Sequence, residues 1–234
     1  MSLVLLKKPI QSVPWEPSIE AWEHIPDWAQ SVAQSMLRAL RHKDPYTYGH
    51  CHRVGRGARL LAKAAGLNKF EQRIVELSGL FHDIGKIAIL DSILLKEGRL
   101  TPDEEHAMRE HPLKSVEILT PLMKIPFFKA TLPGIRHHHE RIDGYGYPDH
   151  LPGEQIPLTA RIVTIADTFD AMTSSRPYRK ALSQDVAYRE IRAHSGRQFD
   201  AQLAKIFLET HSTWGTEEKE MTPDFVAQTF KKAA

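Results

Sequence analysis

Cysteine, long apolar runs and an excess of charge of one sign are all missing from this sequence. Cys51 is the single cysteine among 234 residues, so no internal disulfide can form, and a reducing, cytoplasmic compartment is expected. No apolar run approaches the roughly 20 residues that span a bilayer, so we expect no membrane segment in this chain. The net charge of +2 offers no bulk attraction to a nucleic acid polymer or a membrane surface. Any anionic substrate must be held by local lysines and arginines.

Sustained alternation of apolar and polar residues, the pattern of strands, is also missing, as are repeats and low-complexity tracts. Apolar residues instead recur at helical spacing, for example Ile162, Ile165 and Phe169. Asp44–Pro45 and Thr101–Pro102 each place a capping side chain before a proline, which is typical of a helix start. We therefore expect an all-α fold. Its helices begin near residues 27, 45, 69, 101, 112, 126, 158, 184, 200 and 222, and a loop rich in glycine and proline occupies residues 140–157.

Three segments are expected along the chain. Residues 1–26 hold four prolines and form an extended arm, residues 27–212 form the body, and residues 213–234 form a tail with a helix. The first helix of the body has a larger apolar face than a solvent-exposed helix would need. It either covers the core of its own chain, pairs with a second copy or extends toward a sensory domain. We expect a homodimer to which this segment contributes contacts.

The unusual feature of the chain is a set of histidines and aspartates that could bind metal ions. His82 and Asp83 close an apolar stretch, at the end of a helix expected over residues 69–83, and lead into Gly85–Lys86. Five further candidates lie far apart in the sequence: His50, His111, His138, His139 and Asp167. Each alone has an ordinary explanation, such as a packed histidine or a salt-bridged carboxylate. Imidazoles and carboxylates together are the usual ligands of borderline and hard divalent cations, so the combined pattern predicts a two-metal hydrolytic site.

The other histidines and the cysteine are expected to have no such role. His137 should face away from the neighbouring pair, because three successive helical residues cannot point in one direction. Cys51 should pack in the core. The remaining histidines should be solvated: His42, His52, His106, His150, His194 and His211.

One long motif resembles the defining motif of HD-GYP domains, a branch of the HD phosphohydrolase superfamily. It runs His138-His139-Glu140-Arg141-Ile142-Asp143-Gly144-Tyr145-Gly146-Tyr147-Pro148. Supporting matches are Lys43–His50, His82–Lys86 and Ile156–Arg179, so the resemblance covers roughly residues 30–210. Ile142 departs from the pattern, since an aromatic residue is common there. The resemblance implies an HD-domain helical bundle with the HD-GYP helical extension and an N-terminal arm or helix.

The same resemblance implies an activity, a cyclic-guanylate-specific phosphodiesterase. It would hydrolyse cyclic di-GMP, a bacterial second messenger, to pGpG and/or GMP with a hydroxide activated by two metals. The ligands of one metal would be His50, His82, Asp83 and Asp167. Asp83 would bridge to a second metal, completed by His111, His138 and His139. Tyr46 stands where some family members carry a glutamate for a third metal, so two divalent ions, iron or manganese, are expected.

Residues that touch the substrate are expected around this centre. Lys86 follows Asp83 by one helical turn, where its charge could hold a phosphate oxygen in the transition state, so Asp83 and Lys86 are the expected catalytic residues. Gly146 lets the backbone approach the ligand, and Tyr147 either presents its ring or hydroxyl to the ligand or packs on the domain. Arg176 and Arg179 suit a phosphate or a guanine edge.

Two alternatives remain open. The chain could be an HD hydrolase of another nucleotide, such as another cyclic dinucleotide or an alarmone. It could also be a non-catalytic module whose glycine-tyrosine-proline loop contacts cyclic di-GMP or a diguanylate cyclase. The complete ligand set favours catalysis over the second alternative.

Overall fold

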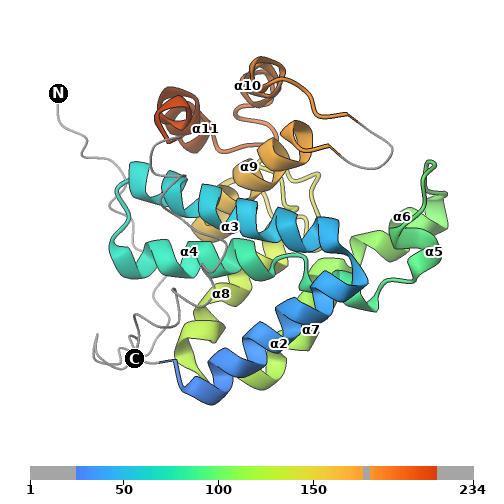
Figure 1. Ribbon diagram of the computed structural model, residues 1–234. Helices are drawn as coiled ribbons and strands as arrows, with labels where there is room; N and C mark the ends of the chain where they lie inside the picture. Colours follow the sequence, from blue (N-terminus) through green and yellow to red (C-terminus); the bar gives the residue numbers. More distant parts are fainter. Residues whose placement is uncertain (1–24, 176–179, 215–234) are drawn as a thin grey trace.

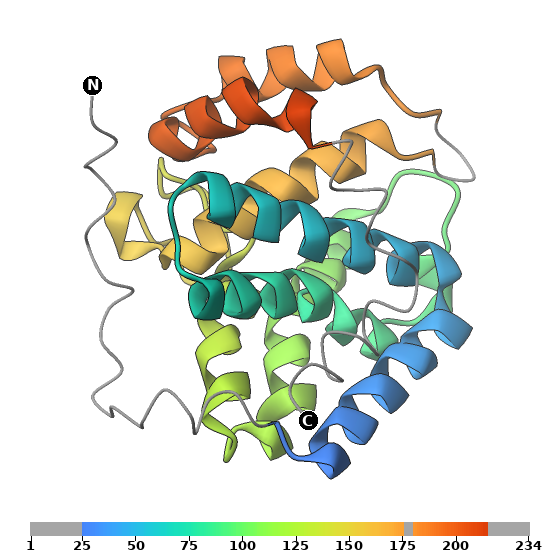
Figure 2. The same ribbon diagram turned by 60° about the vertical axis from the view of Figure 1, so that its left-hand side comes forward.

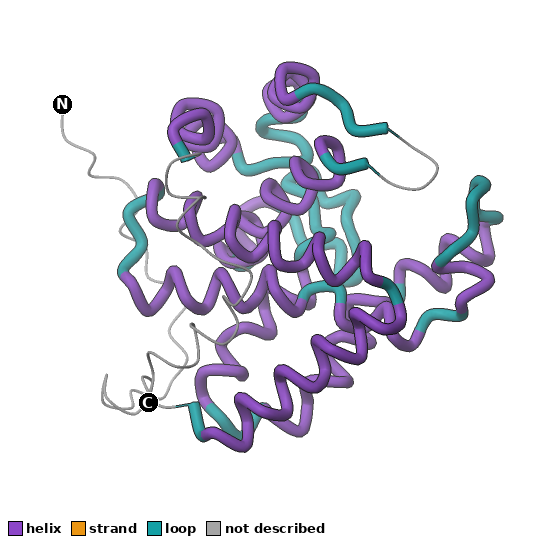
Figure 3. The backbone as a smooth tube through the Cα atoms, viewed as in Figure 1, coloured by secondary structure: helices purple, strands orange, loops and turns teal. Residues whose placement is uncertain are grey.

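The computed structural model describes residues 25–175 and 180–214. Within these ranges the chain is built from helices and contains no strand, as Figure 3 shows, so the predicted all-α class is confirmed. The expected N-terminal arm lies outside the described residues except for its last two positions, and the tail helix and the pair Arg176 and Arg179 lie outside them entirely.

The helices follow one another in the order labelled in Figure 1. Their bounds are α2 Asp27–Lys43, α3 Pro45–Ala64, α4 Lys69–Phe81, α5 Asp91–Leu94, α6 Pro102–Arg109, α7 His111–Leu119, α8 Pro126–His137, α9 Leu158–Thr173, α10 Gln184–Ala193 and α11 Ala201–Thr210. The described residues also form four short 3₁₀ helices: η1 Ile84–Ala88, η2 Thr120–Leu122, η3 Gly153–Gln155 and η4 His211–Thr213.

The helix starts follow from local capping chemistry. The Asp44 carboxylate accepts a hydrogen bond from the Tyr46 backbone nitrogen at 3.0 Å, with Pro45 at the first helical position. Thr101 forms a reciprocal capping box at the start of α6. One boundary differs from the prediction, because α4 ends at Phe81 instead of continuing to residue 83. His82 and Asp83 therefore lie just beyond the helix, where the chain turns into η1.

Helices α3 and α4 pack against each other at backbone distance. A Cβ atom added to Gly79 would lie 2.8 Å from the Gly55 Cα atom, so only glycine at both positions allows this approach. Figure 2 shows the two helices side by side, with α9 crossing α3 and with α10 and α11 above α9. This crossing brings together residues that lie far apart in the sequence, such as His50 and Asp170, which are 120 positions apart.

The buried apolar side chains form two clusters. One lies among α3, α9, α10 and α11 and includes Val54, Ile162 and Phe207. The other lies among α2, α4, α7 and α8 and includes Phe81 and Phe128. Because α3 and α4 contribute to both clusters, they are fixed from two sides. The polar residues that they carry are therefore held in place by the packing of the whole domain.

Helix α2 covers the core of its own chain. Its inner face, which includes Ala29, Ala33 and Leu37, is buried in the second cluster. Its outer face leaves Trp28 57% and Val32 37% exposed. Among the described residues, no helix is both long enough and apolar enough to cross a membrane.

Candidate metal centre

The seven predicted ligands converge in two neighbouring groups. In the first, the Nε2 atom of His50 lies 3.0 Å from Asp167 Oδ1, and the Nε2 atom of His82 lies 3.8 Å from the same oxygen. In the second, the Nε2 atom of His111 lies 3.2 Å from Nε2 of both His138 and His139. The side chains come from α3, α7 and α9 and from the segments that follow α4 and α8.

Asp83 lies between the two groups. Its Oδ2 atom is 3.4 Å from His82 Nε2 and 3.8 Å from His50 Nε2, whereas its Oδ1 atom is 3.1 Å from His111 Nε2. Each oxygen of this buried carboxylate thus faces a different group of imidazoles. A carboxylate in this position can share its oxygens between two cations.

Three of the histidines are oriented by the ends of helices. Their Nδ1 atoms donate to backbone carbonyls three residues earlier: His82 to Gly79 at 2.6 Å, His111 to Met108 at 2.7 Å and His138 to Ile135 at 2.7 Å. The last carbonyls of a helix have no backbone partner within it, so they are free to accept these bonds. Nδ1 of each ring is thereby held against a carbonyl, and Nε2 points into the centre.

The donor set fits divalent cations. With both Nδ1 atoms donating, the Nε2 atoms of His111 and His138 face each other at 3.2 Å with lone pairs and no proton between them. Burial lowers the pKa of His111 to about 3 and the pKa of His139 to about 4, so these rings are neutral at pH 7. Two further buried atoms, His82 Nε2 and Asp83 Oδ1, have no hydrogen-bond partner among the residues that the structure describes. A cation supplies the positive charge that such an arrangement lacks.

Lys86 is the cation of the chain closest to this centre among the described contacts. Its Nζ atom donates to Asp83 Oδ2 at 2.6 Å, one turn along η1. Burial by itself lowers the pKa of Lys86, but the Asp83 carboxylate more than reverses this effect and raises it. The ammonium group therefore stays charged beside the carboxylate.

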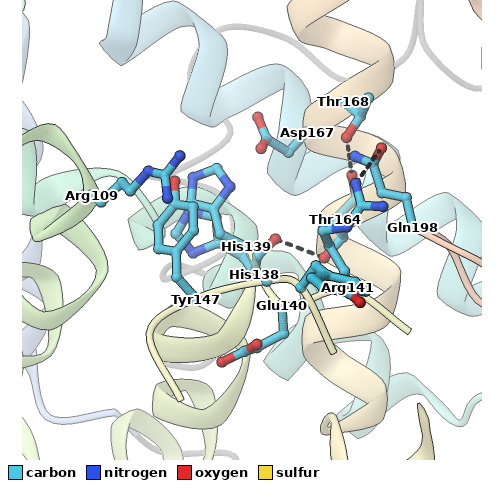
Figure 4. Close-up of a pocket in the computed structure, with 12 residues that line it drawn as sticks. Arg109, His138, His139, Glu140, Arg141, Tyr147, Thr164, Asp167, Thr168 and Gln198 are labelled. Carbon is cyan, nitrogen blue, oxygen red and sulfur yellow. Dashed lines mark hydrogen bonds between the residues drawn. The ribbon is translucent and has the colours of Figure 1, made fainter. Parts of the chain in front are cut away.

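A cavity of about 360 Å³ opens beside the second group of histidines. Figure 4 shows its lining, with Tyr147 in front of His139 and with Asp167 projecting from α9. Its lining residues are Arg109, His138, His139, Glu140, Arg141, Tyr145, Gly146, Tyr147, Thr164, Asp167, Thr168 and Gln198. The lining is mostly polar, and the guanidinium groups of Arg109 and Arg141 could hold an anionic group of a ligand.

The predicted loop residues lie on this cavity, but their contacts are partly internal. The Tyr147 ring stacks on His139 at 4.7 Å between ring centres, and the Arg109 guanidinium lies 5.4 Å from the centre of the tyrosine ring. Tyr147 thus both packs on the domain and lines the cavity. A Cβ atom at Gly146 would lie 2.4 Å from the Glu140 Cα atom. The glycine is therefore required by the loop's own backbone, whatever its relation to a ligand.

Glu140 stabilises the loop of residues 140–157 through the loop's backbone. Its buried carboxylate accepts hydrogen bonds from the backbone nitrogens of Asp149, at 2.7 Å, and Leu151, at 3.1 Å. In Figure 4 it points away from the imidazoles. His137 also turns away, as predicted, and its Nδ1 atom lies 3.4 Å from Asp149 Oδ2.

Several residues near the centre were not predicted. Arg141 donates to both oxygens of Asp143, at 2.9 and 2.6 Å, and reaches Gln198 at 3.4 Å. Arg109 and Gln198 come from segments without a recognisable motif, so only the folded chain reveals them. Arg141 could have been found, because it lies inside the long motif between His139 and Asp143. Asp170, which contacts His50, was also missed.

The expectation that the remaining histidines are solvated was wrong for two of them. The His52 ring packs edge-on against Tyr48, and burial lowers the pKa of His52 to about 4. His211 shares a 2.7 Å hydrogen bond with the Tyr188 hydroxyl, and burial lowers its pKa to about 4 as well. His211 lies where aromatic residues of α9 and α10 meet, which spacing along one segment does not indicate. The neighbour of His52 is on its own helix, four residues earlier. Cys51 is buried and packs in the core as expected.

Comparison with known proteins identifies the family. The model of the HD domain family matches residues 34–203, and the chain belongs to that family. This confirms the family resemblance inferred from the motifs.

Two curated relatives are similar over most of this chain. The cyclic di-GMP phosphodiesterase response regulator RpfG of Xanthomonas campestris pv. campestris (strain 8004) is 44% identical over 173 residues, which are 74% of this chain and 46% of that protein. The 3′3′-cGAMP-specific phosphodiesterase 2 of Vibrio cholerae serotype O1 is 34% identical over 181 residues, 77% of this chain and 34% of that protein. The chain thus spans less than half the length of either relative.

A solved structure shares the fold. It is a cyclic GMP-AMP specific phosphodiesterase of V. cholerae, V-cGAP3, with a TM-score of 0.60 at 19% identity. The similarity covers 86% of this chain and 52% of that one. At this level of identity the likeness concerns the helical architecture alone.

Proposed function

We propose that this chain hydrolyses the phosphodiester bonds of cyclic di-GMP to pGpG and/or GMP. The observation that carries the proposal is the position of Asp83, with one oxygen facing His82 and the other facing His111 in a buried centre beside a polar cavity. The cavity volume of about 360 Å³ falls in the range of small-molecule sites, roughly 300–1,000 Å³. The similarity to RpfG supports cyclic di-GMP as the substrate.

Two divalent cations, iron or manganese, are proposed for the centre. His50, His82, Asp83 and Asp167 would hold one, and Asp83, His111, His138 and His139 would hold the other. When bound, such a pair lowers the pKa of water to near neutrality and neutralises the charge of a phosphodiester. The neutral imidazoles of His111 and His139 fit this role, because a ligand must offer a lone pair and not a proton.

The chain's own residues supply positioning and charge. Lys86 places a fixed positive charge 2.6 Å from Asp83, where it can donate to a phosphate oxygen as negative charge develops on it. On one side of the cavity, Tyr147 and Arg109 offer a ring face and a guanidinium. On the other side, Thr168 and Gln198 offer a hydroxyl and an amide. Arg176 and Arg179 stay predicted substrate contacts, because they lie outside the described residues.

The domain limits, the compartment and the partners are proposed with the activity. Residues 27–212 form the catalytic domain in this proposal, and the single cysteine supports a cytoplasmic location. Tyr145, exposed at the tip of the loop, supports a contact between this loop and a diguanylate cyclase.

A second candidate substrate is 3′3′-cGAMP. The similarity to a V. cholerae phosphodiesterase named for that substrate favours it. The two cyclic dinucleotides differ in one base, so residues that line the cavity and read a base edge would decide between them.

The test is metal content and turnover measured on the same preparations. The chain is purified without oxygen, iron and manganese are determined, and hydrolysis of cyclic di-GMP and 3′3′-cGAMP is followed by chromatography of the products. We expect two metals per chain and faster turnover of cyclic di-GMP. Asp83→Ala should lose metal and turnover together, whereas Asp91→Ala, which removes only a surface partner of Lys43, should keep both.

Other results would redirect the proposal. An Asp83→Ala protein that keeps both metals and near-normal turnover contradicts the bridging position. Faster turnover of 3′3′-cGAMP than of cyclic di-GMP supports the second candidate. A metal-loaded chain that binds either nucleotide without hydrolysing it indicates the non-catalytic module.

A further inference from the structure

His50 is oriented differently from the other buried histidines of the centre. Its Nδ1 atom lies 2.7 Å from Asp170 Oδ2, whereas His82, His111 and His138 use backbone carbonyls. The difference has a cause in the fold. His50 lies in the interior of α3, where carbonyls already accept bonds from the helix itself. A side chain from another element must therefore accept the Nδ1 proton, and α9 supplies it.

Asp170 is fixed in turn by α3. The Arg53 Nε atom donates to Asp170 Oδ1 at 2.6 Å and Nη2 donates to Oδ2 at 3.1 Å. The Ser174 hydroxyl donates to Oδ1 at 3.2 Å. Both carboxylate oxygens are thus engaged by donors of the chain, and Asp170 lies on the Nδ1 side of the His50 ring. These contacts leave Asp170 unsuited to act as a metal ligand itself.

Two pairs of residues, each spaced by three positions, contact each other where α9 crosses α3. Asp167 and Asp170 lie on one face of α9, and His50 and Arg53 lie on one face of α3. The contacts run Asp167–His50–Asp170–Arg53, with His50 Nε2 3.0 Å from Asp167 and Nδ1 2.7 Å from Asp170. Carboxylates and basic groups alternate along this line. The predicted ligands His50 and Asp167 are therefore tied into one chain of contacts with two residues that are not ligands.

We propose that Asp170, held by Arg53, is the positioning residue that makes His50 a metal ligand. It keeps the proton on Nδ1, so that the lone pair of Nε2 faces Asp167 and Asp83. The inference rests on the proposed metal centre and adds a residue to it. A carboxylate behind a ligating imidazole fixes the ring and raises its basicity. Only the cation that His50 holds depends on Asp170, since the other buried imidazoles have carbonyl partners.

Asp170→Asn is the informative substitution. The asparagine keeps the size of the side chain but has one oxygen, for which the charged Arg53 donor competes. The amide nitrogen then faces His50 and donates to Nδ1, which moves the imidazole proton to Nε2 and blocks that atom. If Asp170 served only to pack α3 against α9, its replacement by asparagine would be tolerated.

The control is Asp200→Asn. Asp200 pairs with Arg161 at 2.6 Å and is buried to a similar extent, with its side chain 17% exposed against 11% for Asp170. It contacts no residue of the centre in the described structure. Any loss caused simply by weakening an aspartate–arginine pair appears in both variants.

The measurement is Mn²⁺ affinity of the full chain, by competition titration of metal-free protein, together with the thermal midpoint without metal. We expect Asp170→Asn to weaken one of two Mn²⁺ sites about 10- to 100-fold and to leave the other site near its original affinity. Asp200→Asn should leave both sites unchanged. Arg53→Leu, a change at a half-buried side chain, should weaken the same Mn²⁺ site to a smaller degree. This variant tests the inference if Asp170→Asn does not fold.

The outcomes separate the inference from the proposed function. If His50→Ala loses one Mn²⁺ site while Asp170→Asn and Arg53→Leu bind both as the original chain does, the centre stands and the role of Asp170 is refuted. If the original chain binds no Mn²⁺, or His50→Ala changes nothing, the proposed centre fails and the inference fails with it.

Discussion

At the scale of single residues, the centre depends on which nitrogen each imidazole presents. Carbonyls at helix ends hold the Nδ1 protons of His82, His111 and His138, and a carboxylate does so for His50. In each ring Nε2 is thereby turned toward the centre. The backbone thus does most of the orienting, and the side chains can be neutral and closely packed without mutual repulsion.

Lys86 is expected to act on the chemical step. Lys86→Ala should lower kcat by about 100-fold, as the loss of a donor to a developing charge does elsewhere, while KM and metal content change little. Steady-state kinetics with cyclic di-GMP and metal analysis measure the three quantities. Lys114→Ala, which removes a surface lysine paired with Glu110, is the control. A rise in KM with kcat intact would mean that Lys86 binds substrate and transition state equally.

Glu76 is a buried carboxyl that the catalytic proposal does not use. Its side chain on α4 is 1% exposed, and burial raises its pKa to about 8 in spite of the nearby Arg59 and Arg73. In the unfolded chain the pKa is near 4.5. Between pH 4.5 and 8 the unfolded state therefore releases a proton that the folded state keeps. The free energy of unfolding falls as pH rises through this window, and above it the loss is complete.

Glu76→Gln should remove this pH dependence. The variant should match the original chain near pH 4.5 and exceed its stability at pH 9 by on the order of 2–5 kcal/mol, given about 1.4 kcal/mol per pKa unit. Denaturant unfolding of metal-free protein at both pH values measures the difference. Glu209→Gln, at an exposed side chain, should change nothing. Equal slopes for Glu76→Gln and the original chain would show that Glu76 is ionised when folded.

At the scale of elements, the turn from α4 through η1 determines the position of His82 and Asp83. The Ser115 hydroxyl on α7 donates to the His82 carbonyl at 2.8 Å and accepts from the Gly85 nitrogen at 2.8 Å. A Cβ atom at Gly85 would lie 2.1 Å from the His111 carbonyl oxygen. The turn and α7 therefore approach at backbone distance, and both groups of ligands depend on this approach.

Gly85→Ala tests that dependence. The added methyl group meets backbone that cannot rotate away, so we expect a loss of stability of about 1–3 kcal/mol and weaker binding of both metals. Gly98→Ala is a matched control, since a Cβ atom there meets nothing within 4 Å. Denaturant unfolding and metal titration of the two variants give the comparison. Unchanged metal affinity in a destabilised Gly85→Ala protein would show that the centre tolerates movement of the turn.

The helix starts were predictable because capping is local. Asp44 and Thr101 cap through backbone nitrogens two or three residues away, so the sequence alone contains both partners. The end of α4 and the short helix α5 were not predictable in the same way. The first depends on contact with Ser115 from α7, and the second has too few residues to show a period.

For the centre, the motifs indicated which residues converge but not what surrounds them. Asp170 reaches His50 only because α9 crosses α3, and Gln198 reaches Arg141 across 57 positions. Such partners depend on the packing angle of whole helices, which spacing along one segment does not contain.

At the scale of the whole molecule, the proposed metals join distant parts of the chain. Their ligands come from α3, α7 and α9 and from the ends of α4 and α8, so binding should stabilise the folded state as a unit. At a free metal concentration of 100 Kd the gain is about 2.7 kcal/mol for each occupied site. For a chain of this size each site therefore raises Tm by about 5–11 °C.

Chelation should therefore lower Tm by this amount for each site that it empties, and Mn²⁺ should restore it. Thermal unfolding with EDTA, and then with added Mn²⁺, measures both steps. Asp83→Ala should show neither response, because both sites share that residue. A Tm that ignores chelator and Mn²⁺ alike would contradict metal binding by the folded chain.

Self-association is the remaining prediction at this scale. The inner face of α2 is buried in its own chain, so truncating the helix would uncover the core and confuse the result. The outer face still exposes Trp28 and Val32, which are four residues apart and lie on one side of the helix. Because neighbouring exposed apolar side chains that form a patch can mark an interface, we expect a dimer that uses this face. Trp28→Ser combined with Val32→Ser should convert the dimer to a monomer with an unchanged circular dichroism spectrum.

The control is Leu90→Ser, at a 68% exposed leucine away from α2, which should remain dimeric. Light scattering at micromolar concentration decides: a monomeric original chain refutes the dimer, and a dimeric double variant places its interface elsewhere.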